Sequence, residues 1–309
     1  MALEKQKQPH QKTGERMNKM PMHISHDRAL KWSHEGKSYC LHTQIDDEAG
    51  DSPLSGDTLV SVLSAHPDIK WNVETESIKD YYDYWQETVK HRFSDDEIIQ
   101  LLKAGECPNA KLAEMPDGLY HCHGTDRYGQ EFCEDNLKKE DVKNLISDIM
   151  SHESAIELLS KTHFILPLWS YEHSGITLHA GQRTYPFNDQ FDSSMIGWTF
   201  IEKQAVFKNF PNITENNWAE KANEIITSTI EALNQWLDND IWWFQLFVWN
   251  KEDGGWEELD SCGGFYGSNL ETNGMPDHVG HGLSEAIKRN AVTEDEVKHV
   301  IVEYFGDPK

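Results

Sequence analysis

Five side chains in the first half of the chain are of types that bind transition metals. They are the thiols and imidazoles of Cys107, His121, Cys122, His123 and Cys133. Thiolate and imidazole are the ligands that Zn²⁺ takes in four-coordinate structural sites. The spacing lacks the paired Cys-x2-Cys knuckles of zinc domains, and buried thiols with partly exposed histidines also explain these residues. We favour this second interpretation and expect no bound metal or cofactor.

The second group of reactive side chains is the run Glu172-His173-Ser174-Gly175. A carboxylate, an imidazole and a hydroxyl are groups that could act as a general base and its partners. Adjacent residues of a strand point to opposite faces, however, so these side chains cannot all converge on one substrate. We therefore expect a strand followed by a tight glycine turn, and no catalytic residue.

The second half of the chain has the patterns of strands and one long helix. Residues 163–169 and 195–206 predict strands, and residues 241–265 predict a β-hairpin around a glycine-containing turn. Residues 214–237 carry apolar side chains at helical spacing and predict a long amphipathic helix. The predicted fold class is therefore α+β, with an antiparallel or mixed sheet in the C-terminal half packed by that helix.

The first half has mainly helical signals. Residues 79–91 carry an aromatic stripe at helical spacing, and Ser94 with Glu97 fits a capping box that opens a helix ending at Gly105. Residues 139–161 predict further helix, whereas residues 104–136 read as irregular with turns.

These patterns predict three regions. Residues 1–36 are expected to be a flexible N-terminal arm, and residues 37–160 a mostly helical acidic region. Residues 161–309 are expected to form the α+β domain, with a final helix over residues 294–305.

The composition combines strong negative charge with many aromatic residues. The 309 residues include 53 Asp and Glu against 28 Lys and Arg, a formal net charge of −25, together with 11 Trp, 10 Tyr and 12 Phe. Disordered acidic tails are poor in aromatics, so we expect a folded body with an anionic surface. Such a surface repels nucleic acid and membrane phosphates and attracts basic proteins. The five cysteines do not resemble a disulfide framework, and no apolar run is long enough to span a membrane.

Three blocks of the second half resemble a pattern found in phage and mobile-element proteins. Residues 166–178 read LPLWSYEHSGITL, where those proteins read roughly L-P-L/V-Y-x-Y-D/E-H-S-G-I-T. A stretch at residues 185–189 is followed by Ile196-Gly197-Trp198, and residues 260–267 read DSCGGFYG at the end of the predicted hairpin. With its length and acidity, the chain resembles the phage-encoded Gabija anti-defence proteins.

That resemblance implies a protein that is not an enzyme. It would bind the host Gabija nuclease–helicase complex in the bacterial cytoplasm and block its binding and cleavage of DNA. It would act as a homo-oligomer around its target, with no direct contact to nucleic acid or membrane. Residues 1–160 match no motif of the family, and both DNA mimicry and steric obstruction remain open as mechanisms.

Other functions fit the same residues. The first alternative is a metal-dependent or His-dependent hydrolase of phage origin that uses residues 172–174 or a metal held by residues 107–133. A second is an acidic DNA mimic directed at another host DNA-binding protein. A third is a structural phage protein whose charge serves only solubility.

Overall fold

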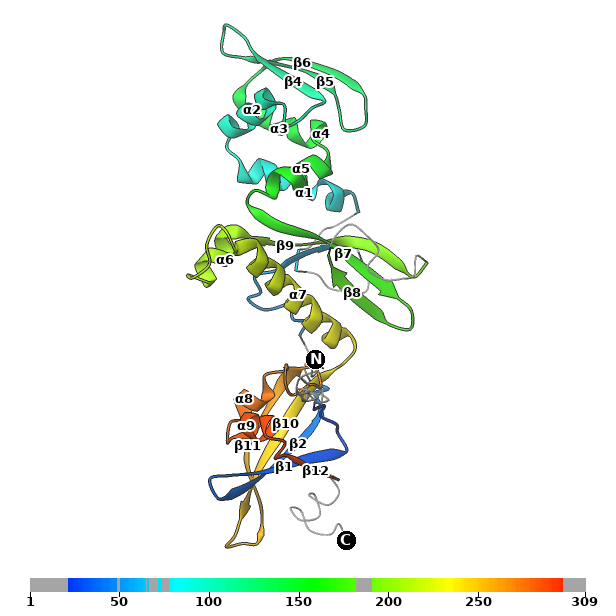
Figure 1. The fold of residues 1–309 in the computed structure, drawn as a ribbon. Coiled ribbons are helices and arrows are strands. Elements are labelled where there is room, and N and C mark those ends of the chain that lie inside the picture. The colour runs from blue at the N-terminus through cyan, green and yellow to red at the C-terminus, as the bar shows by residue number, and fades with distance from the viewer. Residues whose placement is uncertain are drawn as a thin grey trace, which may run out of the picture. The chain divides into compact units, whose positions relative to one another are not determined.

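The chain divides into two units, the second of which is inserted into the sequence of the first (Figure 1). Unit 1 combines Met1–Asp46 with Ile241–Lys309, and unit 2 is the intervening Asp47–Asp240. The computed structural model describes residues 22–48, 51–64, 66, 72–73, 78–181 and 191–296, with backbone alone over 78–82. Most of the predicted arm, residues 1–21, lies outside the described part of the chain.

Unit 1 is a five-stranded antiparallel sheet in the order β11-β10-β2-β1-β12, with two short helices on one face. Its elements are β1 (Arg28–His34), β2 (Lys37–Ile45), β10 (Ile241–Asn250), β11 (Gly255–Tyr266), α8 (Met275–Val279), α9 (Leu283–Lys288) and β12 (Thr293–Glu296). Alternate residues of β10, such as Trp242 and Phe244, pack with Met275 and Leu283 of these helices. The predicted hairpin over 241–265 is confirmed as β10 and β11.

Two expectations at the ends of unit 1 are wrong. The predicted arm, residues 1–36, contains β1, which forms a hairpin with β2 through a two-residue turn. Glu35 and Gly36 of that turn both have positive φ, 49° and 77°, the geometry that suits the twist of paired strands. The predicted final helix starts instead as β12, because residues 294–296 pair with β1, and its remainder lies outside the described residues.

One part of unit 2 is a four-stranded antiparallel sheet in the order β3-β9-β7-β8, covered by a long helix (Figure 1). Its elements are β3 (Ser61–Ser64), β7 (His163–Glu172), β8 (Ile176–Ala180), β9 (Ser193–Glu202), α6 (Lys203–Asn209) and α7 (Trp218–Leu237). The apolar stripe of α7 packs Ile226 and Leu233 against Leu168 and Ile201 of the sheet. The sheet and the long helix predicted for the C-terminal half are confirmed, but the predicted strand over 195–206 ends at Glu202, where α6 begins, and the helix predicted over 214–237 begins at Trp218.

The other part of unit 2 is a helical layer with a three-stranded antiparallel sheet in the order β4-β5-β6. Its elements are α1 (Ile78–Arg92), α2 (Asp95–Ala104), β4 (Ala110–Glu114), β5 (Tyr120–Thr125), β6 (Glu131–Leu137), α3 (Lys139–Asn144), α4 (Ile146–Ile149) and α5 (His152–Leu159). The predicted capping box is confirmed, because Ser94 and Glu97 bond reciprocally and Gly105 ends α2 in a left-handed conformation.

The expectation of a mostly helical region over residues 37–160 is wrong. Strands β2 to β6 all lie within it, and residues 104–136, which read as irregular, form the three-stranded sheet. The three strands of this sheet lacked an apolar alternation because few of their side chains are buried: β4 and β5 each have one buried residue and β6 has none. The predicted boundary at residue 160 also differs from the division between the units, since Asp47–Asp240 forms one body.

Strand β9 joins the two parts of unit 2, because both of its faces are buried. Trp198 and Phe200 enter the helical cluster around Trp85, whereas Ile201 packs beneath α7. The indole of Trp85 lies edge-on to both rings, with centroids 5.8 Å from Trp198 and 5.2 Å from Phe200. Such aromatic pairs stabilise a core beyond the area that they bury.

The helices show no membrane-spanning character in the described part of the chain. The longest one, α7, has 20 residues. Its solvent-facing side carries charged residues such as Glu220 and Lys221, and no described helix combines the length and the apolar content needed to cross a bilayer.

We predict that Trp85→Ala lowers the free energy of unfolding by about 3–5 kcal/mol, because it leaves a cavity between the helical layer and β9. Trp85→Phe should cost less, since Nε1 of Trp85 is buried with no hydrogen-bond partner among the described residues. Urea denaturation measures both changes. Met115→Ala, at an exposed side chain, is the control and should shift stability by less than about 0.5 kcal/mol. Equal effects of Trp85→Ala and Met115→Ala would contradict this account of the core.

Candidate functional site

The five predicted metal-binding candidates separate into two groups in the structure. Cys107 and Cys122 are fully buried in the core between α2 and the three-stranded sheet. Burial raises the pKa of the Cys107 thiol to about 12 and that of Cys122 to about 11, because a thiolate is poorly solvated there. The two thiols are therefore protonated core side chains at neutral pH, as the second interpretation of the sequence expected.

The remaining candidates lie together on the exposed face of the same sheet. His121, Cys122 and His123 follow one another on β5, so the two imidazoles point to one face and the thiol between them to the other. The imidazole centroids are 5.1 Å apart. Cys133 on β6 is the cross-strand partner of His123, which brings its exposed thiol to the same face.

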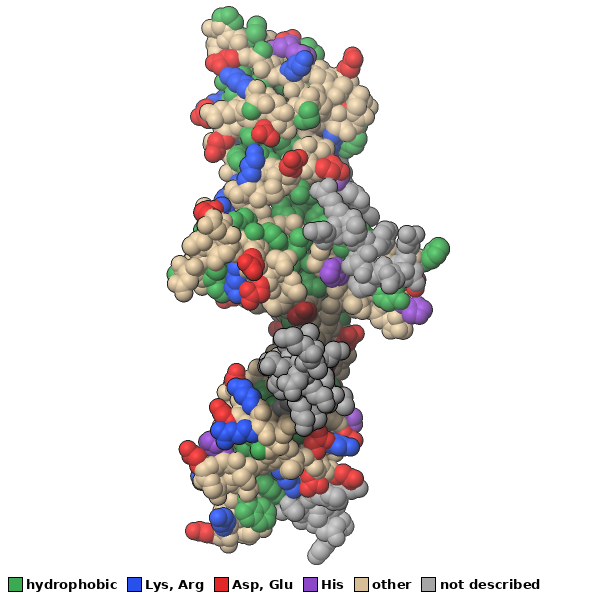
Figure 2. Space-filling model, in the orientation of Figure 1, with side chains coloured by type: hydrophobic (Ala, Val, Ile, Leu, Met, Phe, Trp, Pro, Cys, Tyr) green, Lys and Arg blue, Asp and Glu red, His purple; other side chains and the backbone are tan. Residues whose placement is uncertain are grey.

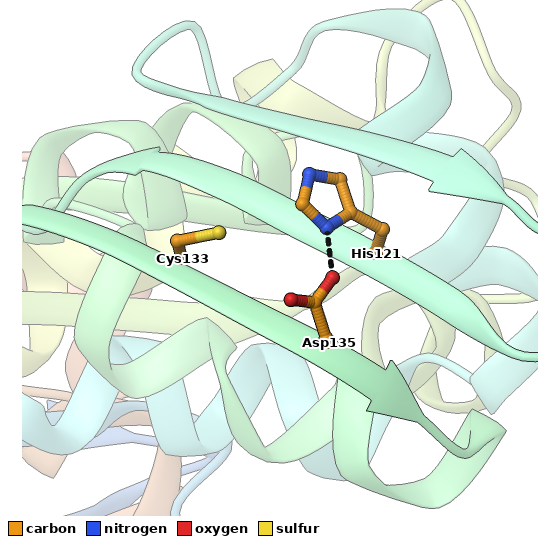
Figure 3. A group of neighbouring side chains, drawn as sticks. All are labelled: His121, Cys133 and Asp135. Atoms are coloured by element: carbon orange, nitrogen blue, oxygen red, sulfur yellow. Dashed lines mark hydrogen bonds and ion pairs between the residues drawn. The ribbon is translucent and has the colours of Figure 1, made fainter.

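A further residue, which the sequence did not single out, completes this cluster. Asp135 lies on β6 two residues after Cys133, and its Oδ1 is 2.6 Å from Nδ1 of His121 (Figure 3). A register shift between Tyr120 and Cys122 brings Asp135 to His121. His121, Cys133 and Asp135 each offer one ligand atom, and these atoms lie within 4.8 Å of one another. Cys133 and Asp135 are two residues apart, a spacing that puts both side chains on one face of a strand. The sequence pattern did not predict a strand over residues 131–137, so it did not group them.

The run of residues 172–175 is the expected strand end and turn. Glu172 ends β7, and Ser174 has a left-handed φ of 65° in the turn to β8. Oε1 of Glu172 accepts hydrogen bonds from Oγ of Ser170 at 2.8 Å and pairs with Nε2 of His66 at 3.2 Å. His173 lies apart from them, with Nδ1 3.2 Å from Oδ2 of Asp192. Glu172 and His173 therefore have different partners and do not converge.

Glycines of the matched blocks sit where backbone or carboxylate groups approach closely. A Cβ at Gly197 would lie 2.0 Å from the carbonyl oxygen of Leu63 on the neighbouring strand. The N–H of Gly264 donates to Oδ2 of Asp46 at 2.9 Å, and a Cβ at Gly263 would lie 2.3 Å from the same oxygen. These glycines therefore serve close packing. The block at residues 185–189 lies outside the described residues.

Five acidic side chains of unit 1 lie along one edge of its sheet. Strand β10 has no charged residue, whereas the turn after it and β11 carry five exposed carboxylates, here named the acidic edge: Glu252, Asp253, Glu257, Glu258 and Asp260. The cross-strand partners of Glu257 and Glu258 are Val248 and Phe247, which point to opposite faces, so the acidic edge presents charge on both faces. Leu259, between Glu258 and Asp260, is 47% exposed.

The acidic edge differs from the other edges of the two larger sheets. On β12, Glu294 pairs with Arg28 at 2.7 Å and Asp295 with Lys31 at 2.9 Å. Asn72 bonds the backbone beside β3, and Asn234 of α7 bonds both backbone groups of Leu178 on β8. No carboxylate of the acidic edge forms an ion pair within the described parts of the chain, and no described strand pairs with the outer side of β11.

Charge elsewhere on the surface is mixed. Figure 2 shows acidic, basic and apolar side chains interspersed over the face that it draws. The acidic edge thus differs from the acidic strand β12 in having no ion pair among the described residues, and not in forming a large acidic patch. Beside it, the indoles of Trp249 and Trp256 meet edge-on with centroids 5.4 Å apart, and both are partly exposed. Aromatic side chains next to charge are typical of protein-binding surfaces.

The burial of the thiols predicts the order in which they react. With a chelator present at pH 8, iodoacetamide should modify Cys133 first, because its thiol is exposed. Cys107 should react only after denaturation, since about one thiol in 10⁴ is ionised at that pH when its pKa is about 12. Peptide mass spectrometry over a time course measures the order, and labelling of Cys107 at the rate of Cys133 would contradict the burial.

The chain was compared with models of protein families, with curated proteins and with solved structures, and none of the three comparisons found a match. The function is therefore inferred from the residues themselves. The features available are the acidic edge of unit 1 and the exposed His, Cys and Asp cluster of unit 2.

Proposed function

We propose that this protein is a non-enzymatic phage anti-defence inhibitor that binds the host Gabija nuclease–helicase complex through basic protein surface. Bound in this way, it keeps DNA from the complex and so prevents cleavage. It acts in the host bacterial cytoplasm as a homo-oligomer. The choice of target rests on the resemblance of the three sequence blocks, and the binding mode rests on the acidic edge.

The observation that carries the binding mode is the absence of cationic partners at the acidic edge in the described residues. Carboxylates that repel one another weaken the folded chain unless a cationic group offsets them. At β12, Arg28 and Lys31 supply that offset within the chain. At β11 a basic partner would supply it, and a DNA-handling protein has such a surface where phosphates bind.

The structure of β11 suits a charged docking edge. Its outer side has no described strand partner, so backbone groups there are available to another chain. Carboxylates on an edge strand disfavour pairing with a second copy of the same acidic strand. The acidic edge therefore selects a partner of opposite charge, with Leu259, Trp249 and Trp256 as apolar contacts.

The test is a charge reversal with a matched control. In Glu257→Lys/Glu258→Lys, the association rate constant with the purified Gabija complex should fall roughly tenfold at low salt, because long-range attraction steers the encounter. DNA cleavage by the complex should recover in parallel. Stopped-flow or surface-based kinetics and a nuclease assay measure the two effects.

The control variant is Glu271→Lys/Glu285→Lys. It makes the same change in net charge at exposed residues of unit 1 outside the acidic edge, and should change the rate constant by less than about twofold. If both variants lowered the association rate constant equally, the acidic edge would not be the docking site. Failure of the wild-type chain to bind the Gabija complex would instead overturn the choice of target.

A further inference from the structure

The strongest unassigned feature is the side-chain cluster on the exposed face of the three-stranded sheet. It lies in unit 2 and has no part in the proposed docking edge of unit 1. His121 comes from β5, and Cys133 and Asp135 come from the neighbouring β6. Figure 3 shows the imidazole and the carboxylate joined by their hydrogen bond, with the thiol on the same side of the two strands.

The distances are close to those of a metal site. One ligand atom from each of His121, Cys133 and Asp135 lies within 4.8 Å of the others. With metal–ligand bonds of 2.0–2.3 Å, tetrahedral zinc places its ligands about 3.5 Å apart. The side chains of Cys133 and Asp135 are exposed, so small rotamer changes can bring their ligand atoms to the shorter separation of a zinc site without moving the strands.

A candidate for the fourth ligand lies on the same face, outside the three residues whose ligand atoms lie within 4.8 Å of one another. His123 shares the face of His121 on β5, and it lies directly across from Cys133 in the register of the two strands. The set then contains two imidazoles, one thiol and one carboxylate. Zn²⁺ accepts nitrogen, sulfur and oxygen ligands in tetrahedral geometry, whereas Mg²⁺ and Ca²⁺ require oxygen ligands.

The charges around the cluster are mixed. Glu131 is exposed on β6 two residues before Cys133, and exposed Lys111 of β4 lies across from His123. Within the described residues no lysine or arginine pairs with Asp135, whose ion-pair partner is His121. Cys107 and Cys122 point into the core on the other side of the sheet and do not compete for the ion.

We propose that His121, Cys133 and Asp135, with His123 as the fourth ligand, bind one Zn²⁺ ion that links β5 to β6. The bound ion holds together the exposed face of a sheet that has few buried side chains on that side. Of the five candidates in the sequence, three are retained, and Asp135 replaces the two buried cysteines.

The test measures zinc content of the untagged full-length chain. After incubation with Zn²⁺ and desalting, the wild type should retain about one zinc per chain by elemental mass spectrometry, with a dissociation constant near 10⁻⁷ M or below. Cys133→Ser and Asp135→Asn should each weaken binding by at least about tenfold. With Co²⁺, the wild type should show thiolate-to-metal charge-transfer absorption, and Cys133→Ser should lose it.

Matched controls separate this site from the chain's other histidines and cysteines. Cys262→Ser removes the other thiol that is not buried, and Glu131→Gln removes a neighbouring exposed carboxylate; both should bind zinc as the wild type does. Unchanged circular dichroism and continued protection of Cys107 show that a variant is folded. Less than about 0.1 zinc per wild-type chain, or equal zinc in the wild type and Cys133→Ser, would overturn the proposal.

Discussion

The pairing of β2 with β10 is the constraint on which the rest of the structure depends. The chain leaves unit 1 after Asp46 and returns at Ile241, and unit 2, the 194 residues from 47 to 240, is inserted between them. The N–H of Asp46 donates to the carbonyl of Ile241 at 2.8 Å, and the Asp46 carboxylate accepts from Gly264 on β11. These bonds close a long loop, whose entropy cost grows only slowly with its length. A large insertion is therefore compatible with a sheet formed by both ends of the chain.

The same pairing places β11 at the edge of the sheet. Strand β10 has two sides, and β2 takes one of them, so β11 can only occupy the other and end the sheet there. The apolar β10 is buried between neighbours, and all charge of the hairpin falls on the turn and β11. At the opposite edge, β12 is acidic too, but Arg28 and Lys31 of β1 form ion pairs with two of its three carboxylates, Glu294 and Asp295. Both edges of the sheet are acidic, but only β12 has neighbouring cations to pair with, and the acidic edge at β11 has none among the described residues.

The sequence predicted those helices and strands whose apolar residues recur at the spacing of one buried face. The capping box at Ser94, the apolar stripe of α7 and the hairpin after residue 241 are examples. It did not predict β4, β5 and β6, because these strands bury too few side chains for apolar and polar residues to alternate along them. Without those strands, the grouping of Cys122 with His121 and His123 was wrong, and Asp135 was missed. Residue spacing alone cannot identify a metal site unless the secondary structure is known, because adjacent residues of a strand point to opposite faces.

The blocks that carry the family resemblance have roles in the fold itself. Gly197 allows β9 to approach Leu63, and Glu172 accepts from buried Ser170 at the end of β7. The N–H of Gly264 donates to the Asp46 carboxylate, and Gly263 leaves room for that carboxylate. Proteins that share these blocks would share the strand contacts that need them, whatever they bind. Recognition of a particular partner must then come from residues that the fold does not require. The carboxylates of the acidic edge are such residues, because they are exposed and form no ion pair among the described residues. Under the proposed function, fold and target are thus specified by different parts of the same hairpin: its glycine-rich end joins the sheet, and its acidic turn and strand face solvent.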